Sequence, residues 1–181
     1  MQKYFEKISG ERLFLSPENP DDAALYTKWL NDPAVTVSLG GYAKVFSLPR
    51  TEREMREAVS RDHSYAIVLR EGERLLGNID FRDVDHLNGK ATLGIFIGEE
   101  ADRGQGYGAE ATRLMLNYAF TTLHLHNVQL EVFSNNAQAI ACYEKVGFKI
   151  SGRRRESVFI EGGFVDEIYM DILDSEFLRN E

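Results

Sequence analysis

Apolar residues recur along the chain with two different spacings. Segments in which apolar and polar side chains alternate predict strands, because successive side chains of a strand point to opposite faces. Segments with apolar side chains three and four positions apart predict amphipathic helices. The predicted strands are residues 11–15, 65–69, 75–81, 91–98 and 128–133, followed by two more that flank Gly162 and Gly163. The predicted helices are residues 21–30, a segment starting at Thr51, residues 111–119 and residues 136–146.

Local signals predict where the helices begin and end. Asp21 or Asp22 is expected near the cap of the first helix, and Asp32 followed by a proline is expected to stop it. Thr51 and Glu54 have the spacing of a capping box, which predicts that the second helix begins at Thr51.

Three dipeptides predict turns between strands. Glu71-Gly72 separates two strands, and Gly162-Gly163 joins the last two. Asn88-Gly89 is a strong hairpin signal, since both residues tolerate a positive φ.

The order of these elements predicts the fold class. One strand is followed by two helices, three strands, a helix, a strand, a helix and two strands. This order is typical of a mixed α/β domain, and its strand-helix-strand unit is expected to be parallel and right-handed. No repeat or linker interrupts the chain, so residues 1–181 are expected to form a single domain.

Composition and charge narrow the class of protein. The 181 residues are 43% apolar and 28% charged, which is ordinary for a soluble globular protein. The absence of a long apolar run or secretion signal, and a single cysteine, Cys142, favour a cytoplasmic protein without a membrane partner. The net charge of −8 argues against nucleic acid as a partner. It mildly favours a cationic substrate, although acidity for solubility is the more common reason for such a charge.

A glycine-rich segment lies between a predicted strand and a predicted helix. Its glycines allow a tight turn with outward-pointing amides, and the helix start adds partial positive charge, which together suit a phosphate or pyrophosphate. The spacing differs from the dinucleotide fingerprint, and the Gly-Lys-Ser/Thr of a nucleotide-triphosphate loop is absent. Taken alone, the glycines fit a plain turn equally well. The segment consists of Arg103, Gly104, Gln105, Gly106, Tyr107 and Gly108.

A second block with chemical potential follows one strand later, at residues 134–148. Asn136 and Tyr143 are seven positions apart, or two helical turns, so their side chains are expected to share a face. Ala139 lies between them and leaves a slot open.

The two blocks together resemble the GNAT acetyltransferase superfamily. Arg-Gly-Gln-Gly-Tyr-Gly resembles its pyrophosphate loop, and Ser-Asn-Asn-x-x-Ala-x-x-x-Tyr-x-x-x-Gly-Phe resembles its pantetheine and catalytic-tyrosine helix. Residues 11–15, 21–23 and 29–33 are similar to the subgroup that includes ribosomal-protein N-terminal and spermidine acetyltransferases. The resemblance implies a central twisted mixed sheet of about six to seven strands, flanked by about four helices, in which two parallel strands splay to admit coenzyme A.

The resemblance also implies a co-substrate, acetyl-CoA, and the residues that bind it. The backbone of Ile95, Phe96 and Ile97 would pair with the pantetheine arm, and an amide near Ile97 would polarise the thioester carbonyl. The loop residues 103–108 would hold the pyrophosphate, and Asn136 would bond the pantetheine.

Two residues are candidates for catalysis of acetyl transfer to a primary amine, such as a polyamine or a peptide N-terminus. Tyr143 is the candidate general acid for the departing thiolate, since a phenol is protonated at neutral pH. Glu131 is the candidate base that takes the proton of the amine, and a solvated or ion-paired carboxylate explains it equally well. The acceptor pocket is expected to come from residues 32–49 and the last hairpin, with Trp29, Tyr42, Phe46 and Asp80 as candidate lining residues.

Several features receive a structural interpretation. His124 and His126 lack a third ligand, so no metal site is expected. Cys142 is expected to be a small buried thiol. Two function classes stay open: a transferase that works by direct attack in a ternary complex, and a non-catalytic acetyl-CoA sensor or interaction module. A homodimer is the assembly considered for either.

Overall fold

The computed structural model describes residues 2–41, 43–58 and 62–177. Its strands are β1 (Ile8–Ser9), β2 (Leu13–Pro17), β3 (Ser64–Leu69), β4 (Arg74–Asp85), β5 (Lys90–Ile97), β6 (Asn127–Phe133), β7 (Lys149–Ile160) and β8 (Gly163–Leu173). Its α-helices are α1 (Ala23–Leu30), α2 (Pro33–Thr36), α3 (Leu48–Ala58), α4 (Tyr107–Thr121), α5 (Ala137–Val146) and α6 (Asp174–Phe177). Short 3₁₀ turns are η1 (Pro20–Asp22), η2 (Glu71–Glu73) and η3 (Glu100–Asp102).

The strands follow the hydrogen-bonded order β1-β2-β3-β4-β5-β6-β8-β7. The β5–β6 pair is parallel, whereas β1–β2, β2–β3, β3–β4, β6–β8 and β7–β8 are antiparallel. This arrangement confirms the predicted mixed α/β fold, with eight strands in the described residues instead of six to seven. The chain forms two compact units, one of Met1–Asp80 with Ile95–Leu114 and the other of Phe81–Gly94 with Met115–Glu181.

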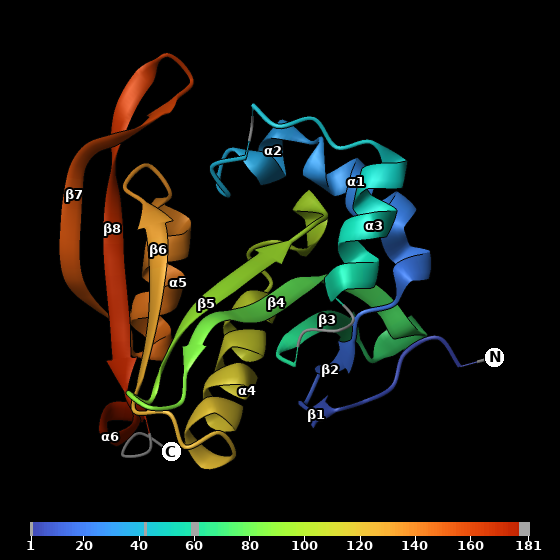
Figure 1. The fold of residues 1–181 in the computed structure, drawn as a ribbon, viewed down its shortest axis with the longest axis horizontal. Helices are drawn as coiled ribbons and strands as arrows, with labels where there is room; N and C mark the ends of the chain where they lie inside the picture. The colour runs from blue at the N-terminus through green and yellow to red at the C-terminus, as the bar shows by residue number, and fades with distance from the viewer. Residues whose placement is uncertain (1, 42, 59–61, 178–181) are drawn as a thin grey trace. The chain divides into compact units, whose positions relative to one another are not determined.

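The first unit contains β1 to β3 and the helices α1, α2 and α3. In Figure 1, α1 and α3 lie side by side. Tyr26 and Trp29 of α1 belong to one buried hydrophobic cluster with Met55 of α3, which explains this packing. Tyr26 is 5% exposed and Trp29 only 1%. Their rings meet edge to face at 5.7 Å, and Phe96 of β5 completes the group at 6.0 and 6.1 Å. The aromatic group therefore anchors the end of β5.

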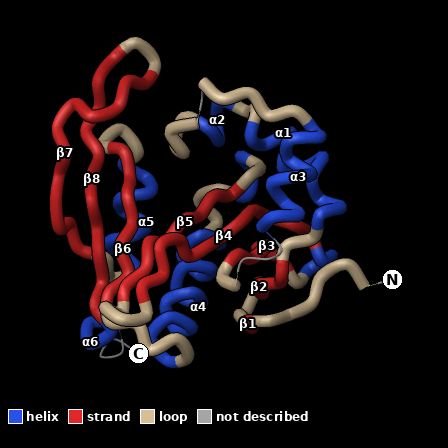
Figure 2. Tube along the Cα trace, viewed as in Figure 1, coloured by secondary structure: helices blue, strands red, loops and turns tan. Residues whose placement is uncertain are grey.

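The second unit is organised around β6, β8 and β7. Val128, Leu130 and Val132 are buried while Glu131 is exposed, as the predicted alternation required. The long β7–β8 hairpin, visible in Figure 2, closes through Glu161 and Gly162, whose φ values are 50° and 87°. Positive φ at both positions is typical of the tight hairpin turn.

One predicted helix start is wrong. Helix α3 begins at Leu48, so Thr51 lies inside it and is buried, and Glu54 pairs with Arg50 at 2.8 Å. The Ser47 hydroxyl accepts the Arg50 amide at 3.4 Å. Pro49 lies in the first turn, where its missing amide costs no hydrogen bond. The cap predicted for the first helix is confirmed, since Asp22 is the N-cap residue of α1, although its side chain makes no capping bond. Asn19 caps the preceding η1.

Other boundaries agree with the sequence more closely. Gly147 ends α5 with a φ of 117°, as predicted for a left-handed cap. Gly72 lies in the turn between β3 and β4 with a φ of 73°. The hairpin at Asn88-Gly89 forms, but only Gly89 has a positive φ, and the carboxylate of Asp85 holds the amide of Asn88 at 3.0 Å.

Candidate active site

The glycine-rich loop leads from η3 into α4, as the sequence predicted. Gly104 and Gly106 have φ values of 74° and 83°, in the left-handed region that residues with a β-carbon rarely adopt. A β-carbon on Gly106 would lie 3.2 Å from a guanidinium nitrogen of Arg12. The loop therefore depends on glycine for its backbone conformation.

The main chain of this loop presents amides without internal partners. The first intrahelical bond runs from the Glu110 amide to the Gly106 carbonyl at 3.0 Å, so the amides before it have no acceptor in the helix. Unsatisfied amides at the start of a helix, reinforced by its dipole, suit a phosphate. Within the described residues, the loop hydrogen bonds include none donated by the amides of Gly104, Gly106, Tyr107 or Gly108.

The side chain of Arg103 is engaged with the backbone. Its Nε donates to the carbonyl of Ile97 at 3.1 Å, one terminal nitrogen donates to Gly98 at 2.7 Å, and the other donates to Ala34 at 2.8 Å. The guanidinium thus connects the end of β5 with α2.

Arg12 and Glu110 support the loop from its other side, and sequence reasoning missed both. Glu110 accepts the Arg12 amide at 2.8 Å and the Arg12 Nε at 2.8 Å. The Arg12 guanidinium also donates to the Gln105 carbonyl at 2.9 Å and lies 4.8 Å from the centre of the Tyr107 ring. Burial alone would raise the pKa of Glu110, but hydrogen bonds from Arg12 and Leu13 leave it lowered.

The end of β5 carries the three residues predicted to pair with pantetheine. A β-carbon on Gly77 of β4 would lie only 2.0 Å from the Phe96 carbonyl oxygen, so the two strands approach closely there. The Gly98 amide donates to the Leu76 carbonyl at 2.8 Å, and the Trp29 ring occupies the space where a Gly98 side chain would lie. Ile95, Phe96 and Ile97 are partly exposed at this fixed strand end.

The parallel pairing of β5 and β6 is short. It joins Lys90 to Asn127, Ala91 to Val128 and Thr92 to Gln129. This register ends at Thr92 and Gln129, although β5 continues to Ile97 and β6 to Phe133.

Tyr143 lies on α5 in the second unit. Its ring contacts that of Phe148 edge to face, with centroids 5.9 Å apart. Burial is the main cause that raises the pKa of the Tyr143 phenol to about 12. The phenol therefore keeps its proton throughout the physiological pH range.

Asn136 and Glu131 belong to the same unit as Tyr143. Asn136 caps α5, since its side-chain oxygen accepts the Ala139 amide at 3.1 Å, and this bond leaves its amide nitrogen for another partner. Glu131 is exposed on β6 opposite Tyr169 of β8. The Tyr169 hydroxyl donates to Glu167 at 2.8 Å, and Glu131 adds to the negative charge that raises the pKa of Tyr169.

The residues predicted to line the acceptor pocket lie in different environments. Trp29 is buried, so it does not line a surface pocket. Phe46 lies under the Arg50 guanidinium at 4.4 Å, and Tyr42 is outside the described residues. Cys142 is partly exposed, against the expectation of a buried thiol.

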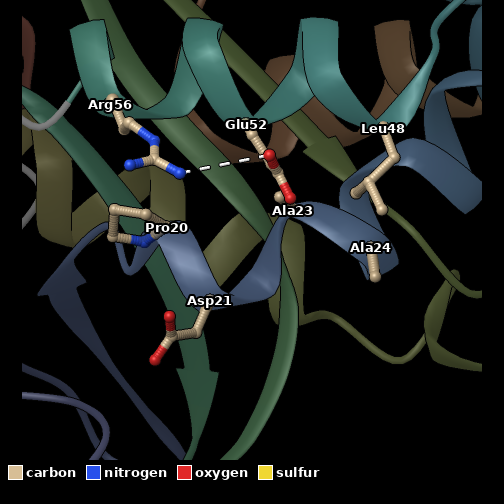
Figure 3. A pocket seen from close by; sticks show the side chains of 7 residues that line it. All are labelled: Pro20, Asp21, Ala23, Ala24, Leu48, Glu52 and Arg56. Atoms are coloured by element: carbon tan, nitrogen blue, oxygen red, sulfur yellow. Dashed lines mark ion pairs between the residues drawn. The ribbon is translucent and has the colours of Figure 1, made fainter.

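A small pocket of about 340 Å³ lies between η1, α1 and α3. Figure 3 shows an ion pair between Glu52 and Arg56 on one side of it and Asp21 on the other. Its lining includes none of the residues predicted to bind acetyl-CoA.

Two findings concern metals and membranes. Among the described residues, no three side chains of the His, Cys, Asp or Glu type are grouped as a metal site would require. No helix in the same ranges has the length and apolar character needed to cross a bilayer.

Comparison with known proteins places this chain in a family. Residues 12–149 match the model of the acetyltransferase (GNAT) domain. An uncharacterised N-acetyltransferase of Bacillus licheniformis, p20, is 24% identical and covers 95% of this chain and 98% of its own length. Spermidine N(1)-acetyltransferase of Escherichia coli is 31% identical over 62% of this chain and 59% of its own length.

Comparison with solved structures agrees with this family assignment in its fold. The crystal structure of Vibrio cholerae spermidine N-acetyltransferase in complex with CoA and spermine has a TM-score of 0.82 and 24% identity, covering 92% of this chain and 98% of that one. The chain therefore belongs to the GNAT acetyltransferase family and is an acetyl-CoA-dependent N-acetyltransferase.

Proposed function

We propose that this protein transfers the acetyl group of acetyl-CoA to a primary amine of a small cationic molecule such as a polyamine, by direct attack in a ternary complex. The loop at the start of α4 is the main observation that supports acetyl-CoA as the co-substrate. There, Gly104 and Gly106 adopt left-handed backbone conformations, and within the described residues no acceptor is assigned to the amides of Gly104, Gly106, Tyr107 and Gly108. These amides could donate hydrogen bonds to an anionic pyrophosphate, so its binding would not require an unpaired lysine or arginine side chain.

Other residues are proposed to bind the rest of acetyl-CoA. Residues 95–97 would offer the backbone of β5 to the pantetheine arm, and the Ile97 amide would bond the thioester oxygen as negative charge develops on it. The side-chain nitrogen of Asn136 would donate to a pantetheine carbonyl, because its oxygen is already used by the cap. Arg103 would contribute through its place in the loop, since its guanidinium already binds three carbonyls.

Two residues would move protons. The amine nitrogen attacks the thioester carbon, its proton passes to Glu131 directly or through water, and the carbon–sulfur bond breaks. Tyr143 then donates its phenolic proton to the departing thiolate. Its pKa of about 12 supports the role of acid, because the proton is present at every pH where the amine reacts.

Three observations favour a cationic acceptor. The chain carries a net charge of −8, which steers cations towards it. A relative with 31% identity is a spermidine N(1)-acetyltransferase, and a structural neighbour was solved with CoA and spermine. A relative with 31% identity over 57% of this chain is a putative ribosomal N-acetyltransferase of Bacillus subtilis, so a peptide N-terminus is the second acceptor to test.

The test is thiol release from acetyl-CoA with a panel of spermidine, spermine, peptides with free N-termini, an aminoglycoside and an amino sugar. We expect turnover with the polyamines to exceed that with the neutral or bulky amines. Turnover with only the peptides would replace the polyamine assignment. Tight binding of acetyl-CoA by calorimetry without thiol release from any amine of the panel would overturn the proposed class of acceptor.

A further inference from the structure

The three hydrogen bonds of Arg103 join two parts of the first unit that have different predicted tasks. Ile97 and Gly98 form the end of β5, which is proposed to present an amide to the thioester. Ala34 belongs to α2, within residues 32–49, where the acceptor pocket is expected. A single guanidinium therefore contacts both the donor side and the acceptor side of the proposed reaction.

The bonds to β5 fix the orientation of the peptide that follows Ile97. The carbonyl of this peptide accepts the Arg103 Nε at 3.1 Å, and its amide, that of Gly98, donates to Leu76 at 2.8 Å. The next carbonyl, that of Gly98, accepts a second arginine nitrogen at 2.7 Å. Fixing this plane places the Ile97 α-carbon, and the strand φ and ψ of Ile97 then set the direction of its amide.

The bond to Ala34 holds α2 in its first turn. The Ala34 carbonyl accepts the Arg103 guanidinium at 2.8 Å, and the Ala34 amide donates to the carboxylate of the N-cap residue Asp32 at 2.9 Å. Because a helix of four residues has few internal hydrogen bonds, these two bonds contribute much of what fixes its position. Val35 and Thr36 are buried, so a shift of α2 would have to disturb its packing as well.

We propose that Arg103 is a positioning residue that couples the acceptor-side helix α2 to the strand end that polarises the thioester, and that its side chain is not a phosphate ligand. This inference rests on the proposed function. The planar fork of arginine, with five donors, is required to reach three carbonyls from two segments. Lysine at this position has one compact ammonium group and can satisfy only part of the set.

The first test measures hydrogen exchange and needs no activity. Arg103→Ala is expected to speed amide exchange in peptides covering residues 33–38 and residues 95–99 together, relative to the parent. The matched control is Arg53→Ala, which removes an exposed arginine from α3 and should leave both peptides unchanged. Faster exchange in only one of the two peptides, or in neither, would overturn the coupling.

The second test compares two acetyl donors, acetyl-CoA and S-acetylpantetheine, which lacks the pyrophosphate. A misplacement near 1 Å typically costs roughly 100-fold in rate, so kcat/KM of Arg103→Ala should fall roughly 10- to 100-fold by the same factor with both donors, and the acceptor KM should rise. A loss seen with acetyl-CoA and absent with S-acetylpantetheine would mean that Arg103 binds phosphate.

Two further comparisons distinguish a failure of the coupling from a failure of the proposed function. Arg103→Lys should give intermediate rates and exchange, and it replaces the alanine variant if that variant does not fold. A fully active Arg103→Lys with unchanged acceptor KM would also contradict the fork requirement. If the parent itself acetylates no amine with either donor, the proposed function fails, whereas the exchange result still decides whether the coupling exists.

Discussion

Removal of the Tyr143 hydroxyl tests the proposed chemistry most directly. In Tyr143→Phe the ring remains, so its edge-to-face contact with Phe148 at 5.9 Å is retained and the fold should be stable. What is lost is the proton for the departing sulfur. General acid catalysis typically contributes ~10²–10⁴-fold, which corresponds to about 2.7–5.5 kcal/mol in the barrier.

The pKa of Tyr143 sets the expected size and the pH profile. With a pKa of about 12, only about one phenol in ten thousand is ionised at pH 8, so the acid is fully available. Such a weak acid transfers its proton late, as charge accumulates on sulfur, and the lower end of the range is therefore expected. The rate of the parent should rise with pH as the amine loses its proton and show no alkaline decline below about pH 10.

Single-turnover rates with saturating acetyl-CoA are the appropriate measurement, because slow product release would mask a change in chemistry. The dissociation constant of acetyl-CoA, measured by calorimetry, should stay within about threefold of the parent value, since the phosphate contacts are made elsewhere. A Tyr143→Phe variant as fast as the parent would show that the residue is structural. An alkaline decline near pH 9 in the parent would show that a different, more acidic group donates the proton.

Three other substitutions test the loop and its support. Gly106→Val should raise the acetyl-CoA dissociation constant at least about tenfold. The control is Gly72→Val, which has a similar φ of 73° and open space around it, and which should cost stability without changing the affinity for acetyl-CoA. Equal affinities of the two variants would refute the assignment of the loop to acetyl-CoA. Glu110→Gln should lower the free energy of unfolding by about 1–2 kcal/mol at neutral pH. Because the pKa of Glu110 lies below its ordinary 4.5, this difference should be complete above pH 4.5 and disappear as the pH falls further. A difference that does not depend on pH would refute this reasoning. Gly98→Ala should cost about 1–3 kcal/mol in denaturant unfolding, because its β-carbon would lie 2.1 Å from the Trp29 ring, while Gly163→Ala, with no atom within 4 Å, is the control; equal midpoints would refute the close packing.

The sequence predicted the elements whose signal is local. The alternation in residues 128–133 gave β6, and the glycine after residue 146 gave the end of α5. Both depend on short-range patterns of burial and backbone conformation, which a single sequence displays. The start of α3 was missed because Thr51 and Glu54 also have a helical spacing inside a helix, where Thr51 bonds the Ser47 carbonyl instead.

The support of the loop could not be read from the sequence for a different reason. Arg12 and Glu110 are separated by almost a hundred positions, and nothing in either local segment indicates the other. Arg103 illustrates the same difficulty, since an arginine that opens a glycine loop suggests a phosphate ligand. Its actual acceptors are carbonyls at residues 34, 97 and 98, and two of these became its neighbours only through the turn that η3 makes after β5.

The charged side chains around the loop are largely used to hold backbone in place. Arg12 is paired with Glu110, and Arg74 makes two bonds to the buried carboxylate of Asp102, one of them at 2.8 Å. Arg103 is shared among three carbonyls. A pyrophosphate at this loop would therefore be met by neutral amides in fixed directions, not by mobile cations. Fixed amides lose little entropy when an anion binds, and they hold it in one place, so the thioester at the far end of the same molecule can be presented to the strand end with little freedom.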